Sequence, residues 1–302
     1  MLKRFEGNPI LKPIPSHPWE SKMVFNCGAI YLNDRFHILY RARDKKDIST
    51  FGYASSRDGF HIDERFKKPV FSPESEIDYY GCEDPRIVKI KDMLYITYTA
   101  YGKVSGMSKK ASIQIGMTSI SIDDFVNHRW NWGERIYPLP RVDNKDCVIF
   151  PEKIGGKYVI YHRIPPHIWV SYSDDLVHWY NHDIVMSPKD GWEYFKLGAG
   201  ATPIKTKKGW LFIYHAVDKK MFYRLGFAFI DLNDPKKVIY RHPEPILSPE
   251  EKCEKTGVVA NVVFTCGTVL KDGKVFVYYG GADTVIGVAT ADLDQFFKEA
   301  GF

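Results

Sequence analysis

Short hydrophobic stretches and polar turns alternate along the whole chain. A run of apolar and aromatic residues closed by a tyrosine recurs five times, and each copy is followed by a turn and by a strand with a small-residue motif. The copies lie roughly 60 residues apart, a spacing typical of repeat architectures. The closing residues are Tyr40, Tyr98, Tyr161, Tyr214 and Tyr279. Repeats of this length, made of short strands, predict a propeller of small antiparallel sheets.

Helical periodicity is nearly absent, and only residues 292–300 are expected to form a helix. A pair of β-sandwiches is the alternative all-β fold, but a sandwich would not repeat the same three-strand unit five times. The sequence therefore predicts an all-β, five-bladed β-propeller with a short C-terminal helix, in which residues 1–302 form one catalytic domain.

The repeat also predicts which side chains meet. Residues that follow the closing tyrosines, and residues just before each first strand, are expected at one end of the central channel. They include Asn26, Arg41, Arg43, Glu83, Asp84, Lys145, Asp146, Arg163, His215, Asn261 and Asp283. Carboxylates and cations that converge on one opening are typical of an enzyme site.

Composition narrows the function further. The net charge is +5, and no block of Lys and Arg is long enough to indicate nucleic acid, so a local cationic pocket for an anion is expected instead. No run of about 18 apolar residues is present, so no membrane span is expected. The five cysteines are odd in number and lack the C-x-x-C spacing of metal sites. We therefore expect reduced, mostly buried thiols, no metal site and a cytoplasmic protein.

The segment Glu83-Asp84-Pro85-Arg86 carries the strongest candidate acid. Pro85 is expected to restrict Asp84 to an extended backbone. A partly dehydrated carboxyl at a channel mouth would have a raised pKa and could act as a general acid. The structural alternative is an Asp–Arg ion pair within a loop.

Three basic residues, Lys145, Arg163 and His215, are candidates for binding an anion. Arg offers a planar fork that suits phosphate, Lys a point charge and His an oriented donor. The alternative is that they form separate salt bridges with acidic residues nearby in the sequence. Those acidic residues are Asp146, Glu152 and Asp218.

Taken together, the motifs resemble glycoside hydrolase family 130, whose members are mostly mannoside phosphorylases on a five-bladed propeller. The matching segments are 40–43 (YRAR), 56–59 (SRDG), 83–86 (EDPR), 145–146 (KD), 150–153 (FPEK), 162–163 (HR), 198–203 (GAGATP), 209–210 (GW), 214–218 (YHAVD) and 279–284 (YGGADT). Each motif is weak alone, but their order and spread cover nearly the whole chain. The Tyr-His-Gly-Val of the family is Tyr-His-Ala-Val here, which leaves His215 in place.

The resemblance implies an inverting glycoside phosphorylase that cleaves β-mannosides with inorganic phosphate to give α-mannose 1-phosphate. Asp84 would be the only catalytic carboxyl and would pass its proton through the mannose 3-hydroxyl. The phosphate ligands would be Lys145, Arg163 and His215, and the mannosyl ligands Asn26, Arg43, Glu83 and Asp283. Phosphate serves as co-substrate, and no metal or organic cofactor is implied.

Three other functions stay open. A hydrolase of the same family would work without phosphate, and a non-catalytic glycan-binding propeller would bind sugar without cleaving it. A furanosidase-like propeller would need three carboxylates, which Glu83, Asp84 and Asp283 could supply.

Overall similarity favours β-1,2 over β-1,4 linkages, but the acceptor loops, for example 102–110 and 219–224, do not identify the acceptor sugar. The sequence also leaves the oligomeric state open, a homo-oligomer included.

Overall fold

The computed structural model describes residues 1–103 and 111–302, in which 20 strands form four sheets. Most of the loop at 102–110 therefore lies outside the described residues. The seven-stranded sheet contains β2 (Met23–Leu32), β3 (Arg35–Arg43), β4 (Ser49–Ser56), β5 (Glu64–Arg65), β6 (Gly81–Ile90), β7 (Met93–Lys103) and β8 (Ala111–Ser121). A single parallel bridge, Ser49 to Gly81, joins its two antiparallel halves.

The other three sheets are smaller. One contains β9 (Lys145–Ile149), β10 (Tyr158–Ile164), β11 (His167–Ser173) and β12 (Trp179–Met186). The next contains β13 (Lys196–Ala199), β14 (Ile204–Thr206), β15 (Gly209–Val217), β16 (Tyr223–Ile230) and β17 (Val238–Arg241). The last contains β18 (Val263–Lys271), β19 (Lys274–Gly281), β20 (Val285–Asp292) and the early strand β1 (Lys3–Arg4).

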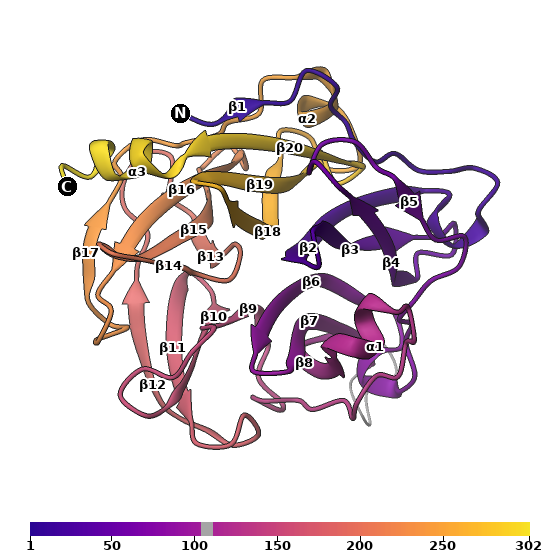
Figure 1. Ribbon diagram of the computed structural model, residues 1–302, viewed down its shortest axis with the longest axis horizontal. Coiled ribbons are helices and arrows are strands. Elements are labelled where there is room, and N and C mark those ends of the chain that lie inside the picture. Colours follow the sequence, from indigo (N-terminus) through magenta and orange to yellow (C-terminus); the bar gives the residue numbers. More distant parts are fainter. Residues whose placement is uncertain (104–110) are drawn as a thin grey trace.

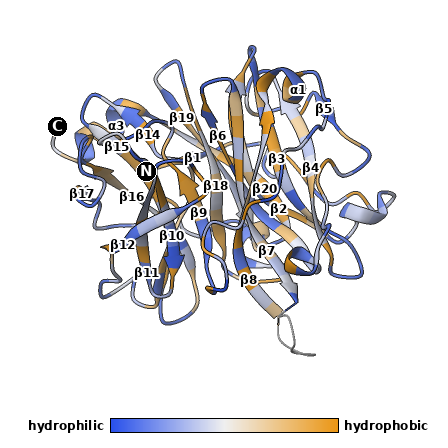
Figure 2. Cartoon of the chain, turned by 90° about the horizontal axis from the view of Figure 1, so that it is seen from below, coloured by the Kyte–Doolittle hydropathy of each residue, from blue (hydrophilic) through white to orange (hydrophobic). Residues whose placement is uncertain are grey.

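The sheets surround a common centre, and β2, β6, β9, β13 and β18 lie nearest to it (Figure 1). Strands carry most of the hydrophobic residues, whereas the loops are mainly hydrophilic (Figure 2). The hydrophobic clusters lie mostly between neighbouring sheets or half-sheets, for example where Phe150 meets Trp210. Burial between the sheets therefore holds the molecule together around its centre.

The closing tyrosines explain the small-residue motif of the repeat. In four copies the tyrosine lies directly opposite a glycine of the next strand, as Tyr40 lies opposite Gly52. An added Cβ at Gly52 would lie 2.3 Å from the Tyr40 ring, so only glycine leaves room for it. The third copy differs, because Val170 stands opposite Tyr161.

Helices are short in the described part of the chain. The expected C-terminal helix is α3 (Leu293–Glu299), which buries Phe296 and Phe297. Sequence periodicity did not indicate α1 (Ile122–Val126), α2 (Lys252–Lys255), η1 (Pro18–Glu20) or η2 (Glu76–Asp78). These elements are too short to show a period and depend on local caps, such as the Ser121 hydroxyl that accepts a hydrogen bond from the Asp124 amide.

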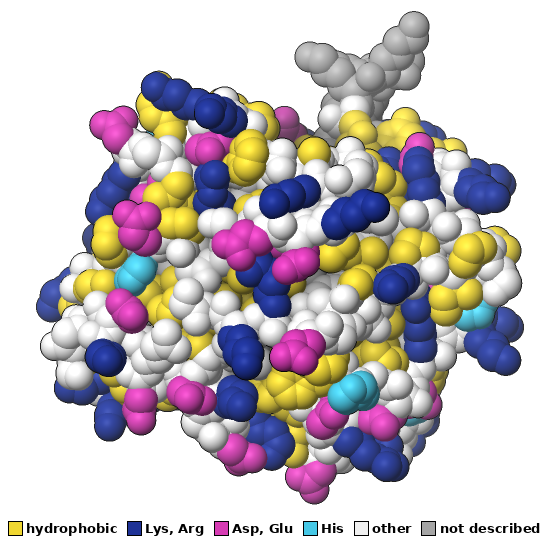
Figure 3. Space-filling model, turned by 90° about the horizontal axis from the view of Figure 1, so that it is seen from above, with side chains coloured by type: hydrophobic (Ala, Val, Ile, Leu, Met, Phe, Trp, Pro, Cys, Tyr) yellow, Lys and Arg dark blue, Asp and Glu magenta, His cyan; other side chains and the backbone are white. Residues whose placement is uncertain are grey.

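The sequence also led us to expect reduced, mostly buried cysteines and no membrane span. All five cysteines are unpaired, and four of them are buried. Within residues 1–103 and 111–302, no helix has the length and apolar character needed to cross a membrane. Basic and acidic side chains are interspersed over the face shown in Figure 3.

Candidate active site

Asn and Asp residues in left-handed backbone conformation lie in the inner strands. Asn26, Asp84 and Asp146 have φ angles of 44°, 54° and 56°. Each lies where the strand register shifts, and such bulges redirect a side chain and are frequent beside active sites. Asn and Asp tolerate this conformation better than most residues. The expectation that Pro85 holds Asp84 extended is therefore wrong: the bulge determines the backbone there.

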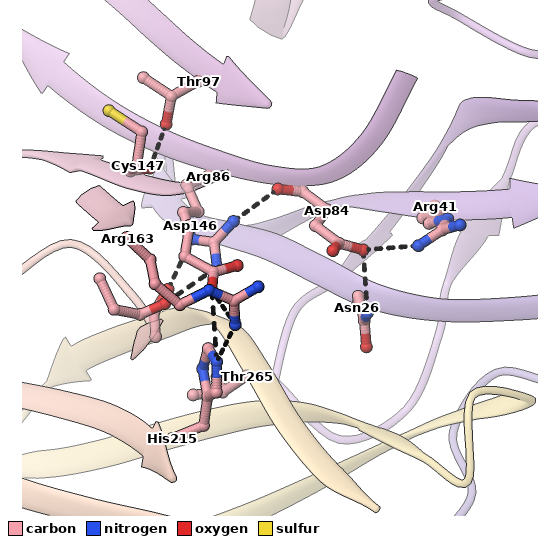
Figure 4. A network of polar contacts seen from close by, with 12 residues as sticks. Asn26, Arg41, Asp84, Arg86, Thr97, Asp146, Cys147, Arg163, His215 and Thr265 are labelled. Carbon is pink, nitrogen blue, oxygen red and sulfur yellow. Dashed lines mark hydrogen bonds and ion pairs between the residues drawn. The ribbon is translucent and has the colours of Figure 1, made fainter. Parts of the chain in front are cut away.

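The Asp84 carboxylate is buried and accepts two hydrogen bonds (Figure 4). Its Oδ1 lies 2.9 Å from Asn26 Nδ2 and 3.0 Å from Arg41 Nη1. Burial acts to raise the pKa of Asp84, but the positive charges of Arg41, Lys145 and Arg86 outweigh it and hold the pKa below its ordinary value. The raised pKa expected from the sequence is therefore wrong.

Arg86 connects Asp84 to the next group of residues. Its guanidinium donates to the backbone oxygens of Asp84 (2.9 Å), Ala199 (2.9 Å) and Gly200 (2.8 Å), and to Asp146 Oδ1 at 3.2 Å. Arg86 thus contacts the main chain of Asp84, and the Asp84 carboxylate pairs with Arg41 instead. The loop ion pair that the sequence left open is not formed between these two side chains.

Asp146 gathers two of the predicted phosphate ligands. Its Oδ2 lies 2.8 Å from Arg163 Nη1 and 3.3 Å from His215 Nε2, and all three residues are buried. Burial lowers the pKa of His215 to about 4, although Asp146 opposes this. His215 is therefore neutral at pH 7 and can donate one oriented hydrogen bond. Arg163 does form a salt bridge with Asp146, as the structural alternative allowed, but the bridges are not separate, because His215 lies against the same carboxylate.

Lys145 and Lys196 add positive charge to the same place. Lys145 and Arg163 both line a hollow of about 220 Å³. Burial, together with the charges of Arg163 and Lys145, lowers the pKa of Lys196 to about 8. Across the described residues, Lys145 and Lys196 have no acidic partner within salt-bridge distance. Cations held this close are stabilised when an anion joins them.

The other predicted mannosyl ligands are distributed around Asp84. Glu83 pairs with Arg41 and accepts a hydrogen bond from Ser49. Burial raises the pKa of Asp283 to about 6, where Arg41 opposes the rise and the Asp84 charge adds to it. Arg43 instead pairs with Asp47 at 3.2 Å, and no contact joins its side chain to Asp84 in the described part of the chain.

The structure therefore brings together Asn26, Glu83, Asp84 and Asp283 on one side and Lys145, Arg163 and His215 on the other, with Arg86 between them. Arg41 and Lys196 are site residues that the predicted ligand set lacked. Lys196 could have been found two positions before the Gly198-Ala199-Gly200 motif, and Arg41 in the YRAR motif that also supplied Arg43. A buried carboxyl beside a cationic pocket can hold an anion and an acid on one substrate.

Comparisons with known proteins agree over the whole chain. A family model described as beta-1,4-mannooligosaccharide phosphorylase matches residues 1–299. The chain is 46% identical over 300 residues to a 1,2-beta-oligomannan phosphorylase of Thermoanaerobacter sp. (strain X514), with 97% of each chain covered. It is 44% identical over 308 residues to a beta-1,2-mannobiose phosphorylase of the same strain, covering 97% of this chain and 98% of the other. The solved complex of beta-1,2-mannobiose phosphorylase from Listeria innocua with beta-1,2-mannobiose matches with a TM-score of 0.87, 26% identity and 99% of each chain.

Proposed function

The chain belongs to glycoside hydrolase family 130 and is a glycoside phosphorylase, and from this premise we propose that it cleaves β-1,2-linked mannosides with inorganic phosphate. The linkage follows the two relatives of highest identity described above. The observation that carries the proposal is the shared location of Asp84 and the cations Lys145, Arg163 and Lys196, since a hydrolase needs no such excess of positive charge.

In the proposed reaction, a phosphate oxygen attacks the anomeric carbon of the terminal mannose as the bond to the leaving oxygen breaks. The proton of Asp84 reaches that leaving oxygen through the mannose 3-hydroxyl. The products are α-mannose 1-phosphate and a mannoside shortened by one unit. Phosphate is already an anionic nucleophile, so the second carboxylate that an inverting hydrolase uses as base is unnecessary. We assign no metal or organic cofactor to these steps.

Phosphate also supplies what the acid needs. Arg41, Lys145 and Arg86 keep Asp84 ionised at neutral pH. A bound phosphate beside Lys145 would offset part of that positive field and so raise the pKa of Asp84. Binding of the nucleophile thereby favours the protonated acid that the reaction requires. Asn26, Glu83 and Asp283 would hold the mannosyl hydroxyls, and Arg43 would act from the rim.

We further propose that the sheets are five blades of one propeller and that residues 1–302 form a single domain. The seven-stranded sheet divides into two antiparallel halves at its one parallel bridge, which would give five units in all. Hydrophobic clusters between neighbouring units support this arrangement. A cytoplasmic location stays a prediction.

The function is tested by incubating the enzyme with β-1,2-mannobiose and β-1,4-mannobiose, each with and without phosphate. We expect mannose 1-phosphate from the β-1,2 substrate only when phosphate is present. Release of free mannose in phosphate-free buffer would instead identify a hydrolase. Binding of the disaccharide without any cleavage would identify a glycan-binding protein.

Asp84→Asn tests the acid. Asn keeps the side-chain shape and tolerates the left-handed backbone, so the fold should persist, and the melting temperature should fall only by what the ion pair with Arg41 contributes. General acids contribute about 10²–10⁴-fold, and kcat should fall by at least about 10²-fold. Near-normal turnover in this variant would remove Asp84 from the role of proton donor.

A further inference from the structure

A second hollow, of about 580 Å³, lies at the rim beside the turn that joins β15 to β16. Its wall combines an aromatic ring from the segment before β13 with the turn residues 218–222. The lining residues that matter here are Asp190, Tyr194, Asp218, Lys219, Phe222 and Arg224. Neither the proposed acid nor the proposed phosphate ligands belong to it.

Adjacent exposed aromatic rings mark this rim. Tyr194 and Phe195 are 43% and 49% exposed, although they follow one another in the chain. Single exposed hydrophobic residues are common, but clustered ones next to a hollow indicate a binding surface. The Lys219 ammonium lies 3.9 Å from the Tyr194 ring centroid, and the Arg224 guanidinium 5.0 Å from that of Phe222. These cations therefore lie against the rings that line the hollow.

The polar groups of the hollow are held in place before any ligand binds. Asp218 accepts hydrogen bonds from the Lys220 amide (2.8 Å), the Phe222 amide (3.0 Å) and Arg224 Nη1 (2.8 Å). The turn is therefore preorganised, which reduces the entropy lost on binding. Fixed carboxylate and guanidinium groups beside aromatic faces suit a sugar, which offers hydroxyls to the former and C–H faces to the latter.

The hollow adjoins residues that lie beside the reacting site. The Phe195 amide donates to Val217 at the end of β15, and the next residue is Lys196. Lys196 Nζ lies 5.5 Å from the Phe195 ring centroid and 5.4 Å from that of Tyr223. Tyr223 in turn lies close enough to Arg163, Asp146, Asp283 and Asp84 to feel their charges. Phe222 and Arg224 of the hollow flank Tyr223 in the chain, so the hollow lies on the side of the reacting site that Lys196 and Tyr223 border.

We propose that this hollow binds the mannosyl units of an oligomannan that lie beyond the sugar next to the cleaved bond. The proposal rests on the proposed function and deepens it, because it makes an oligosaccharide longer than mannobiose the preferred substrate. The ligand is neutral: Asp190 and Asp218 would oppose a bound anion, and Lys219, Lys220 and Arg224 a bound cation. Tyr194 and Phe222, whose rings line the hollow, are the specificity-determining residues.

The test compares β-1,2-mannobiose with β-1,2-mannotetraose as substrates of the wild type and of Tyr194→Ala and Phe222→Ala. Loss of a stacking ring should lower kcat/KM for the tetraose about tenfold. The value for mannobiose should stay within about twofold, because mannobiose does not reach the hollow. Tyr194→Phe keeps the ring and should restore the tetraose rate.

Phe302→Ala is the matched control, since Phe302 is 43% exposed and has a lysine over its ring but lies at the C-terminus, on the outer edge (Figure 1). Phe302→Ala should leave kcat/KM unchanged for both substrates. Equal losses for both substrates in the rim variants, or no preference of the wild type for the tetraose, would overturn the proposal.

Calorimetric binding of the tetraose separates this proposal from the proposed reaction. If the wild type releases no mannose 1-phosphate yet binds the tetraose, and Tyr194→Ala does not, the reaction is wrong and the sugar site stands. If both proteins bind the tetraose equally, the sugar site is wrong whatever the reaction.

Discussion

At the scale of single residues, the balance between burial and neighbouring charge sets the protonation of each acid in the site. Asp84 is buried and Asp283 half-buried, yet the pKa of Asp84 is lowered by the positive charges around it and that of Asp283 is raised to about 6, chiefly by burial. Both feel Arg41 and Lys145, but only Asp84 accepts a hydrogen bond from Arg41, at 3.0 Å. Sequence reasoning could place both carboxyls at the mouth but could not decide which one a guanidinium would touch.

Lys145→Ala and Arg163→Ala test the anion pocket. A hydrogen bond to a charged group contributes about 1.5–3 kcal/mol, so each variant should raise the phosphate KM by roughly tenfold or more. The mannoside KM should change far less. Arg163→Ala should also lower the melting temperature, because it leaves Asp146 with one partner fewer.

Lys157→Ala is the matched control for this pair of variants, since Lys157 is an exposed lysine before β10 that pairs with Asp174 at 2.6 Å. It should leave both KM values unchanged. A phosphate dependence equal to that of the wild type in Lys145→Ala would exclude Lys145 from the pocket.

Asp283→Asn should change stability in a pH-dependent way. The folded pKa of Asp283 is about 6, above its ordinary value of 3.8, so its ionisation destabilises the fold as pH rises from about 4 through 6. A pKa moved this far corresponds to about 3 kcal/mol at most, and solvent contact at this half-buried residue reduces it to about 1–2 kcal/mol. The variant should therefore melt several degrees above the wild type at pH 8 and at the same temperature at pH 4. An equal difference at both pH values would contradict the assignment.

At the scale of elements, the strands were predictable and the bulges were not. The tyrosine-closed repeat located the inner strands, because the repeat period and the apolar content of a strand can be recognised in a single sequence. The bulges at Asn26, Asp84 and Asp146 determine which side chains face the centre, and they depend on contacts with neighbouring strands. The available signal is an Asn or Asp within an apolar strand. It indicates a position at the channel but not the backbone conformation of that residue.

Buried triads near the outer ends of the sheets also escaped sequence reasoning. The Tyr214 hydroxyl donates to Glu193, which pairs with Arg241 at 2.5 Å. Glu20 and Glu254 join a closing tyrosine to an arginine in the same way. The arginines come from the short strands β1, β5 and β17, and the acids from η1, α2 and the segment before β13. These positions have no common spacing, so no repeat period reveals them.

Arg241→Met tests how much such a triad stabilises its sheet. The substitution leaves Glu193, which is 3% exposed, as an uncompensated carboxylate, and this should lower the free energy of unfolding by about 3–5 kcal/mol. Lys236→Met is the control, because Lys236 and Asp183 form an exposed pair between β12 and the segment before β17. Lys236→Met should change the free energy of unfolding by no more than about 0.5 kcal/mol, measured by chemical denaturation. If both variants lose the same free energy of unfolding, the buried triad stabilises the fold no more than the exposed ion pair does.

At the scale of the whole molecule, the two ends of the chain meet in one sheet. The early strand β1 pairs with β20 through Lys3 to Thr290 and Arg4 to Ala289. Leu2 enters the hydrophobic cluster that joins the third and fourth sheets, and Arg4 pairs with buried Glu254 at 2.8 Å. In the proposed propeller this strand closes the ring, a non-local contact that no local sequence pattern indicates.

Deleting residues 1–11 tests this closure. The edge of β20 would lose its partner and Glu254 its arginine, which together should lower the melting temperature by several degrees and promote aggregation. Activity should fall as well, because Asp283 lies between β19 and β20 of the same sheet. Deleting Gly301 and Phe302 is the control, and it should leave the melting temperature and the activity nearly unchanged. If the first deletion melts at the wild-type temperature in scanning calorimetry, the early strand does not hold the molecule closed, and the sheets must be held around their centre by the clusters between them.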